Sequence, residues 1–585
     1  MSHAKRCLRV SSQSKQTLKC DDKVVRKTIL AVFVCALIIV ALAWFNRTSI
    51  FLFIAYNTGK VDVAETREIV WESGVAQSYT PVGQRPPNIV FILADDLGIN
   101  DISTFGGGVA DGRVKTPNID RLAADGAIFS TAYSGGATCA PSRAMLMTGR
   151  YPTRTGYEFT PAPDSMGPLI ARVTPNTQVK YGLPPLVHNP AHEEVGIEFW
   201  DKGLPTEEVT VAEVLQQVGY HNVHIGKWHL GRSAPSRAVS QGFDESLMMA
   251  SGLFLKEDDP NGVNAKLDFD PLDKFIWARM QFAADFDRKG DKLIEEWFEP
   301  GGYLTDYYTD EALKAIEANK NRPFFLYLAH WGPHTPLQAT REDYEAVGDI
   351  EPHRLRVYAA MVRAIDRSVG RVVQKLEQEG LSDNTIIIFS SDNGGAGYVG
   401  LKDLNQPYRG WKSSFFEGGI RVPFFVKWPE RIKPGTVIDE PVSHVDLLPT
   451  LTAVAGTSDP AGVAIDGKNI LPLATGEASS VERANDALYW SSGFYKTVRA
   501  GDWKLQVDER QNKRWLFNLA EDPTERTDLS RERPGKLKEL QSLIDRHWQT
   551  ATSPLYPHAM EWPVRIDKTN TEPFERTDEY VTWAN

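Results

Sequence analysis

Residues 88–96 read Asn-Ile-Val-Phe-Ile-Leu-Ala-Asp-Asp, an apolar run that stops abruptly at two acids. A short continuous run of this kind predicts a central β-strand that is covered on both faces. Three more runs of the same type follow at residues 221–225, 323–328 and 385–389, each with a helical pattern before it. Strands that alternate with helices predict a large, mostly parallel α/β sheet flanked by helices.

Two of the helical patterns have clear signatures. Thr210-Val-Ala-Glu213 is a capping box and predicts the start of an amphipathic helix. Over residues 355–379, apolar residues recur every three or four positions, as they do on one face of a helix. From residue 484 the pattern changes to short alternating segments, and a helical stretch follows at residues 535–550. This change predicts a small C-terminal antiparallel α+β subdomain.

Polar side chains that could serve catalysis follow all four predicted strands. In open α/β sheets, ligands bind outside the carboxyl ends of the strands. Each residue alone also has a structural explanation, since acids cap helices and histidines can be buried in cores. Their joint arrival at one edge of the sheet predicts an active site. In chain order these residues are Asp95, Asp96, Lys227, His229, His330, His334, Asp392 and Asn393.

The charge of the chain is unevenly distributed. The 585 residues carry −11 in total, but residues 1–45 hold eight Lys and Arg against two Asp, so the remainder carries −17. An acidic surface does not attract nucleic acid, and it repels a polyanionic substrate at long range. We therefore expect no nucleic-acid partner, and we expect any anion to be recognised locally.

The N-terminal segment predicts export. A basic tail (residues 1–28) precedes an apolar run (residues 29–45), and acidic residues follow, which favours an N-terminus on the cytoplasmic side. Ala41-Leu-Ala43 resembles a signal-peptidase site, so a cleaved signal peptide is the alternative to a transmembrane anchor. The long tail and a second apolar stretch at residues 50–56 favour the anchor. The main domain is then tethered at the periplasmic face of a bacterial inner membrane or, after cleavage, is periplasmic or secreted.

A linker (residues 46–86) is predicted to lead to a catalytic domain (residues 87–483), and the small subdomain (residues 484–585) completes the chain. Two stretches of the catalytic domain are rich in Pro, Asp and aromatic residues: residues 157–206 and 252–302. In both, the alternation of strand and helix patterns is interrupted. We expect them to be long excursions around the mouth of the pocket, because loops of this length are commonly functional.

Only one of the four cysteines lies in the exported part of the chain. Cys7 and Cys20 lie in the tail and Cys35 lies in the apolar run, so Cys139 has no partner for an intramolecular disulfide. A lone cysteine in a large exported domain, with a single glycosylation sequon at Asn46, favours a bacterial protein. A single cysteine is often a small buried apolar residue. The residues next to Cys139 instead indicate a catalytic role.

Cys139 begins the string Cys-Ala-Pro-Ser-Arg143, and Leu146-Met-Thr-Gly-Arg150 follows it. These strings resemble the signature of the sulfatases, a formylglycine-dependent, arylsulfatase-like family of the alkaline phosphatase superfamily. The resemblance covers most of residues 86–530 and implies a sulfuric ester hydrolase. It also implies that a formylglycine-generating or equivalent maturation enzyme converts Cys139 to formylglycine. Further matching stretches begin at Thr116, Gly226, Glu417 and Leu516.

The position of Cys139 has a physical rationale. Pro141 suits the first turn of a helix, which places Cys139 at the helix N-terminus. Exposed N–H groups and the helix dipole favour a tetrahedral oxyanion there. Arg143, one turn further along, is always charged and can brace the hydrated aldehyde and a metal-bound oxygen.

A metal site is predicted from the acidic strand ends. Asp95, Asp96, Asp392 and Asn393 offer oxygen ligands, which suit a hard cation, and the absence of Cys or His clusters argues against zinc. By resemblance the ion is one Ca²⁺ per chain, with Mg²⁺ as the alternative, and the modified Cys139 joins its ligands. The cation would polarise a sulfate oxygen as a Lewis acid.

The resemblance also implies roles for the basic residues. Lys227 and Lys412 would contact sulfate oxygens. His229 would be the base for collapse of the sulfated diol, and His334 would lie near the leaving oxygen. Two further histidines are assigned structural roles: His330, which has no family counterpart, and His444.

Several alternatives stay open. A phosphonate monoester or phosphodiester hydrolase of the same superfamily would use the same groups. Phosphoethanolamine transferases of the superfamily use a threonine nucleophile and several membrane spans, unlike this chain. A non-catalytic glycan binder would have lost part of the constellation, whereas every expected position is filled. The substrate is open between aryl sulfates, sulfated sugars and polysaccharides, and the oligomeric state is open as well.

Overall fold

The computed structural model contains two units, one ending at Gly59 and the other spanning Lys60–Asn585. The first contains α1 (Asp22–Phe45) and α2 (Arg47–Thr58). Within α1, the segment Arg26–Phe45 has a mean hydropathy of 2.8 and could cross a membrane by length and composition, a test that a signal sequence also passes. The structure describes the chain from residue 22 onward except residues 59–60, 77–80, 164–165, 192–195 and 292–295.

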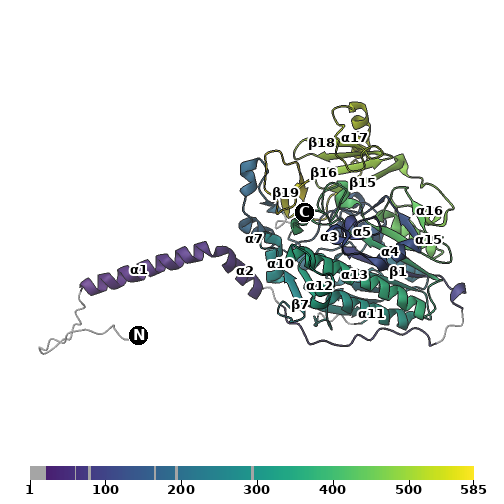
Figure 1. Cartoon of the computed structure of the whole chain (residues 1–585), viewed down its shortest axis with the longest axis horizontal. Coiled ribbons are helices and arrows are strands. Elements are labelled where there is room, and N and C mark those ends of the chain that lie inside the picture. The colour runs from purple at the N-terminus through teal and green to yellow at the C-terminus, as the bar shows by residue number, and fades with distance from the viewer. Residues whose placement is uncertain (1–21, 59–60, 77–80, 164–165, 192–195, 292–295) are drawn as a thin grey trace. The chain divides into compact units, whose positions relative to one another are not determined.

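Among the described residues, nine strands form the central sheet of the second unit (Figure 1). Its four middle strands pair in parallel and correspond to the four apolar runs of the sequence, so the predicted sheet is confirmed. In spatial order they are β11 (Thr385–Ser391), β1 (Asn88–Asp95), β9 (Phe324–Pro333) and β5 (His221–Gly226). The outer strands are β12 (Phe424–Lys427), β2 (Ala127–Phe129) and β13 (Thr436–Ile438) beside β11, and β6 (Glu245–Met249) and β8 (Ala284–Arg288) beside β5.

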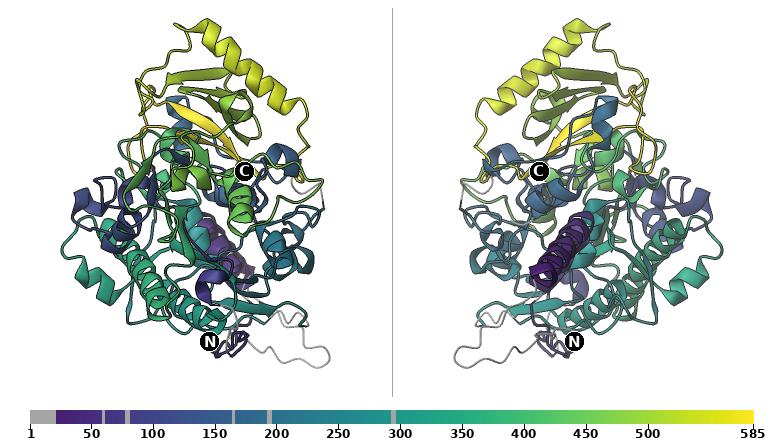
Figure 2. Two further views of the ribbon diagram at one scale, coloured as in Figure 1. Left: turned by 90° about the vertical axis from the view of Figure 1, so that its right-hand side faces the viewer. Right: turned by 90° about the vertical axis from the view of Figure 1, so that its left-hand side faces the viewer.

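Helices cover both faces of this sheet (Figures 1 and 2). The apolar side chains of β1 alternate between two cores, with Val90 and Ile92 on one face and Ile89 and Phe91 on the other. This is why β1 is apolar from Ile89 to Ala94. The helices that contribute to the cores are α11 (Leu304–Asn319) and α13 (His353–Gln378) on the first face, and α5 (Cys139–Thr148), α9 (Val211–Gln217) and α15 (Leu447–Val454) on the second.

The C-terminal part forms the predicted antiparallel sheet, which lies at the top of both views in Figure 2. Its strands pair in chain order, and Leu540 and Ile544 of the helix α17 share a core with Val498 and Leu505 of the sheet. The elements are β15 (Ala487–Ser492), β16 (Tyr495–Ala500), β17 (Trp503–Asp508), β18 (Lys513–Asn518) and α17 (Pro534–Trp548).

The last two strands return to the catalytic body and form a second small sheet. β19 (Met560–Arg565) pairs with β20 (Tyr580–Ala584) and with β4 (Val187–His188), which belongs to the first excursion. The chain end and residues 157–206 are therefore held together. Sequence patterns did not predict this sheet, because β4 has only two residues.

The second excursion contains regular structure that the sequence analysis missed. Residues 252–302 include β8, which is an edge strand of the central sheet. Its sequence Ala-Asp-Phe-Asp-Arg contains no apolar run. The strand can hold two acids because Asp285 and Asp287 form ion pairs with Arg237. The same excursion also contains β7 (Gly262–Ala265) and α10 (Pro271–Arg279), and the first contains α7 (Met166–Val173).

Part of the segment predicted as a linker packs on the body of the second unit. Trp71 is buried, and its Nε1 donates a hydrogen bond to Glu311 at 2.8 Å. Ala64 forms a β-bridge with Phe298. Residues 61–76 thus belong structurally to the catalytic body.

Candidate active site

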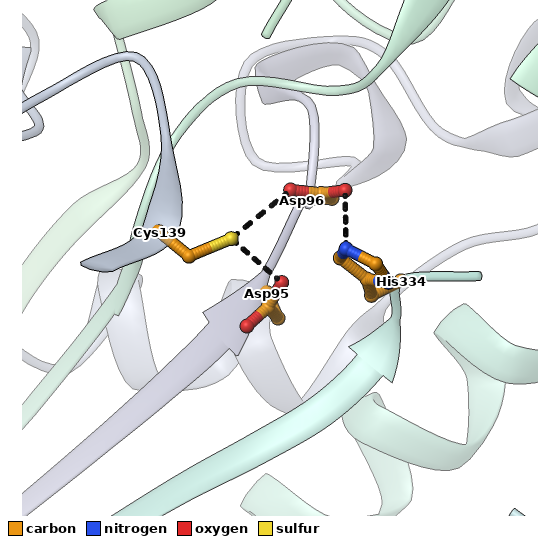
Figure 3. A group of neighbouring side chains, drawn as sticks. All are labelled: Asp95, Asp96, Cys139 and His334. Carbon is orange, nitrogen blue, oxygen red and sulfur yellow. Dashed lines mark hydrogen bonds and ion pairs between the residues drawn. The ribbon is translucent and has the colours of Figure 1, made fainter. Parts of the chain in front are cut away.

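The acidic end of β1 meets the start of α5 and the end of β9. Figure 3 shows Asp95, Asp96, Cys139 and His334 pointing toward one another, and one ligand atom from each lies within 4.8 Å of the others. Sγ of Cys139 lies 3.5 Å from Oδ1 of Asp95 and 4.0 Å from Oδ1 of Asp96. Asp96 has a φ of 60°, so the chain turns directly after the strand in a conformation that few non-glycine residues adopt.

Cys139 is the first residue of α5, as the sequence predicted. The first N–H groups of a helix have no partner within the helix, so an anion at this position is favoured. Burial, together with the negative charges of Asp392 and Asp95, raises the pKa of the Cys139 thiol. The unmodified thiol therefore stays protonated at neutral pH, and a protonated thiol is a poor nucleophile.

Arg143 joins three strand ends beneath Cys139. Its side chain is fully buried and donates to Oδ2 of Asp95 at 2.6 Å and to Oδ2 of Asp392 at 2.9 Å. A third bond, of 2.6 Å, reaches the backbone oxygen of Lys227. The rigid guanidinium thus sets the positions of β1, β5 and β11 relative to the residue that begins α5.

Two lysines bring positive charge to the same place. Lys412 Nζ lies 3.3 Å from Sγ of Cys139 and 2.8 Å from Oδ1 of Asp96. Lys227 Nζ lies 2.6 Å from Oδ2 of Asp95. Both ammonium groups are nearly inaccessible, so their attraction for an anion is weakly screened.

The acids of the site differ in how firmly they are ionised. Burial alone would raise the pKa of Asp95, but Lys227 and Arg143 outweigh it and hold that pKa well below its usual range. Burial and the negative charge of Asp95 raise the pKa of Asp392 to about 7. Asp392 therefore lacks part of the positive charge that would stabilise its carboxylate.

The donor set fits a divalent cation. Asn393 donates through Nδ2 to Asp96 at 2.7 Å, whereas its carbonyl oxygen Oδ1 is buried without a hydrogen-bond partner among the described residues. A buried oxygen of this kind needs a partner. Three acids already balance the three cationic side chains of the site, so bound sulfate would add an uncompensated charge. Oxygen donors from Asp95, Asp96, Asp392 and Asn393 suit a hard cation.

His334 is held by contacts on two sides. Its Nδ1–H donates to the backbone oxygen of Thr335 at 2.6 Å, which leaves Nε2 facing Oδ2 of Asp96 at 3.5 Å. Burial lowers the pKa of His334 to about 4 against the opposing effect of Asp96. The imidazole is therefore neutral at neutral pH, and it must gain a proton on Nε2 before it can act as an acid.

Trp331 is a site residue that the sequence analysis missed. Its ring stacks on His334 with centroids 4.0 Å apart and planes at 26°, and Nζ of Lys227 lies 4.5 Å from the same indole. The indole Nε1 donates to the backbone oxygen of Gly252 at 3.0 Å. One side chain therefore restricts both a histidine and a lysine of the site. The signal was its position between His330 and His334 at the end of a strand.

Tyr398 was missed as well. Its hydroxyl donates to Oδ2 of Asp96 at 2.9 Å. The glycine-rich stretch Asp392-Asn-Gly-Gly-Ala-Gly-Tyr398 carries it back over the site, and those glycines were the available signal.

The remaining histidines differ in their surroundings. His229 is half-buried at a φ of 61°, and its Nδ1 has no hydrogen-bond partner among the described residues. Desolvation and the charges of Lys227 and Arg143 hold the pKa of His229 well below its usual range, so it is neutral. His330 and His444 are fully buried and bond through Nε2 to serine hydroxyls at 2.8 and 2.9 Å, while Nδ1 of each, like that of His229, has no partner among the described residues.

The two excursions meet close to the site. Trp200 of the first and Trp297 of the second have ring centroids 6.2 Å apart. The guanidinium of Arg232, five residues beyond Lys227, lies 5.4 Å from the Trp200 ring. Arg232 in turn donates to the backbone oxygen of Ala250 at 2.8 Å.

A buried residue at a helix start, faced by cations and acids at the carboxyl edge of a parallel sheet, defines a hydrolase of anionic esters. The family model described as Sulfatase matches residues 87–457, more than half of the chain. The chain therefore belongs to the sulfatase family and is a sulfuric ester hydrolase. A second model, for the C-terminal part of N-sulphoglucosamine sulphohydrolase, matches residues 409–554.

Relatives and solved structures agree with this assignment. N-acetylgalactosamine-6-sulfatase of Rattus norvegicus is 33% identical over 72% of this chain and 72% of its own length. Arylsulfatase J of Mus musculus is 29% identical over 81% of this chain and 78% of its own length. The crystal structure of Ps i-CgsB in complex with k-i-k-neocarrahexaose has a TM-score of 0.63 and 30% identity, over 81% of this chain and 95% of that chain.

Proposed function

We propose that this sulfatase works through a formylglycine at position 139 and a bound Ca²⁺. The observation that carries the proposal is the position of Cys139, which begins a buried helix within reach of Asp95 and Lys412. The neutral thiol described above would be a weak nucleophile. A formylglycine-generating or equivalent enzyme would have to act before the site closes, because Cys139 is only 3% exposed in the folded chain.

Asp95, Asp96, Asp392 and Asn393 would hold the cation, together with residue 139. When bound, the ion would polarise a sulfate oxygen and offset the charge that three acids and a sulfate bring together. The unpaired Oδ1 of Asn393 and the raised pKa of Asp392 support this set of ligands.

The other side chains would bind the sulfate and move protons. Lys227 and Lys412 would hold sulfate oxygens, since both ammonium groups face residue 139 across the acids. Arg143 would keep the helix start and the strand ends aligned. His334 would give a proton to the leaving oxygen, with Asp96 stabilising its charged form. His229, held neutral, would accept a proton at residue 139 when sulfate is released.

The N-terminal part would determine where the enzyme acts. Residues 29–45 lie within a helix that is apolar enough to span a membrane. We infer a single-pass anchor with the catalytic domain (residues 87–483) and the C-terminal subdomain (residues 484–585) at the periplasmic face of a bacterial inner membrane. Cleavage of residues 29–45 as a signal would release the same domains.

The test compares a sulfate ester with a phosphodiester that has the same 4-nitrophenolate leaving group. Assays of 4-nitrophenyl sulfate and bis(4-nitrophenyl) phosphate with the same preparation should show kcat/KM higher for the sulfate by at least ~10²-fold, about 2.7 kcal/mol of transition-state binding. Equal or preferred turnover of the phosphodiester would overturn the proposal in favour of a phosphodiester hydrolase.

A further inference from the structure

A second cavity lies outside the proposed catalytic residues. Its volume is about 310 Å³, and it opens between the first excursion, the turn from β17 to β18, and the hairpin of β19 and β20. This volume lies at the lower end of the range of ~300–1,000 Å³ typical of small-ligand sites. Residues Pro184 and Pro185 form an apolar part of its wall.

Two aromatic residues in this cavity have free polar ends. Trp562 and Tyr580 line it and are partly exposed. Within the described parts of the chain, neither Nε1 of Trp562 nor the hydroxyl of Tyr580 has a hydrogen-bond partner. An aromatic face beside an unused donor suits a ligand with an apolar face and hydroxyl groups, which is the chemistry of a sugar ring.

An ion pair of Arg510 and Glu561 lines the cavity. Nη2 of Arg510 lies 2.9 Å from Oε2 of Glu561, which is itself held by His558 at 2.9 Å. The Arg510 side chain is 61% exposed, so part of its donor fork stays free for an anion. Because the chain beyond residue 45 carries −17, a polyanion gains no long-range attraction and needs such a local contact.

The cavity and the catalytic site share one structural element. In the connection between β19 and β20, the backbone N–H of Asn570 donates to the oxygen of Gly397 at 3.2 Å. The next residue, Tyr398, donates to Asp96 in the catalytic site. The hairpin that lines the cavity therefore also contacts the segment that carries Tyr398.

We propose that this cavity binds a sugar unit of a sulfated oligosaccharide while a sulfate of another unit lies at residue 139. The ring would stack on Trp562, and Arg510 would contact a sulfate or carboxylate of that unit. This inference rests on the proposed function and narrows its substrate to sulfated glycans of several units.

The test uses Trp562→Ala and Arg510→Ala with two probes, k-i-k-neocarrahexaose and a chondroitin 6-sulfate hexasaccharide. With the hexasaccharide that the wild type hydrolyses, each variant should raise KM by about tenfold, while kcat/KM for 4-nitrophenyl sulfate stays at the wild-type value. Trp562→Tyr should recover part of the loss. Arg514→Ala is the matched control, because Arg514 is exposed on β18 and does not line the cavity.

Binding to the inactive Cys139→Ala protein, measured by calorimetry, separates this inference from the proposed function. Hexasaccharide binding that weakens about tenfold in Cys139→Ala/Trp562→Ala supports the cavity even if turnover fails. The proposal is overturned if neither hexasaccharide binds, if the variants bind as tightly as their parent, or if KM for both substrate sizes changes equally.

Discussion

Two buried clusters of charged side chains in this molecule differ in how completely their polar atoms are paired. The first lies at the carboxyl edge of the central sheet. We call it the catalytic cluster, and it consists of Asp95, Asp96, Arg143, Lys227, His229, Asp392, Asn393 and Lys412. The second joins α14 (Glu417–Ile420) of the catalytic body to β17 of the C-terminal sheet. We call it the joint cluster, and it consists of Glu417, Lys504 and Glu525, all of them fully buried.

Every polar side-chain atom of the joint cluster has a partner. Lys504 Nζ lies 2.8 Å from Glu417 and 3.1 Å from Glu525. Tyr133 donates to Glu417 at 2.9 Å, and Gln506 donates to Glu525 at 2.9 Å. Burial acts to raise the pKa of Glu417, but Lys504 and its neighbouring arginines lower it to about 2, whereas burial and the charge of Glu417 raise the pKa of Glu525 to about 7.

The catalytic cluster is incomplete in comparison. Oδ1 of Asn393 and Nδ1 of His229 are buried without partners among the described residues. Buried charge alone therefore does not mark a functional site, because it also joins two parts of a fold. What separates the two clusters is the unpaired oxygen of Asn393 among the acids of the catalytic cluster, since no side-chain atom of the joint cluster is left unpaired.

The comparison of the two clusters predicts that the largest loss of activity follows from substitution of Asp95. Asp95→Ala should lower turnover of 4-nitrophenyl sulfate by at least ~10³-fold, because it removes a proposed cation ligand and the partner of Lys227 and Arg143. Elemental analysis of the purified variant should show the loss of Ca²⁺, while circular dichroism shows a folded protein. Full metal content with near-normal turnover would remove Asp95 from the site.

A smaller and more selective effect is expected at His334. General acid help is typically worth ~10²–10⁴ in rate, and a good leaving group needs little of it. His334→Ala should therefore slow the hydrolysis of an alkyl sulfate far more than that of an aryl sulfate, as read from kcat/KM. Equal losses with the two leaving groups would contradict the role of His334 at the leaving oxygen.

A substitution in the joint cluster should change the stability of the protein and not its catalytic activity. Glu417→Gln takes from Lys504 one of its two carboxylate partners and from Arg421 the carboxylate at 3.2 Å, and it should lower the free energy of unfolding by ~2–3 kcal/mol in urea denaturation. Metal content and kcat of the remaining folded enzyme should match the wild type. Glu539→Gln, which breaks an exposed pair with Lys536, is the control and should cost at most ~1 kcal/mol. A Glu417 variant that keeps its stability but loses metal would break the distinction between the clusters.

Much of this structure was predictable because the decisive signals are local. The apolar runs that form β1, β5, β9 and β11 predict strands that are buried on two faces. The residues that follow parallel strands meet at one edge of the sheet. β8 escaped prediction because its acids are neutralised by an arginine outside the strand.

Residues whose role depends on tertiary contacts could not be predicted. Trp331 and Tyr398 are ordinary aromatics in the sequence and become site residues only where they contact His334 and Asp96. The second cavity combines Pro184 with residues near the C-terminus, a separation that no local pattern can report.

The central claim is that residue 139 acts as formylglycine, and peptide mass spectrometry tests it most directly. The protein is produced in a host with a formylglycine-generating enzyme, assayed with 4-nitrophenyl sulfate, and digested. The account predicts that the peptide containing residue 139 carries an aldehyde in place of the CH₂–SH group, in a fraction that tracks the specific activity across preparations. Full activity in protein whose Cys139 thiol is intact would contradict it.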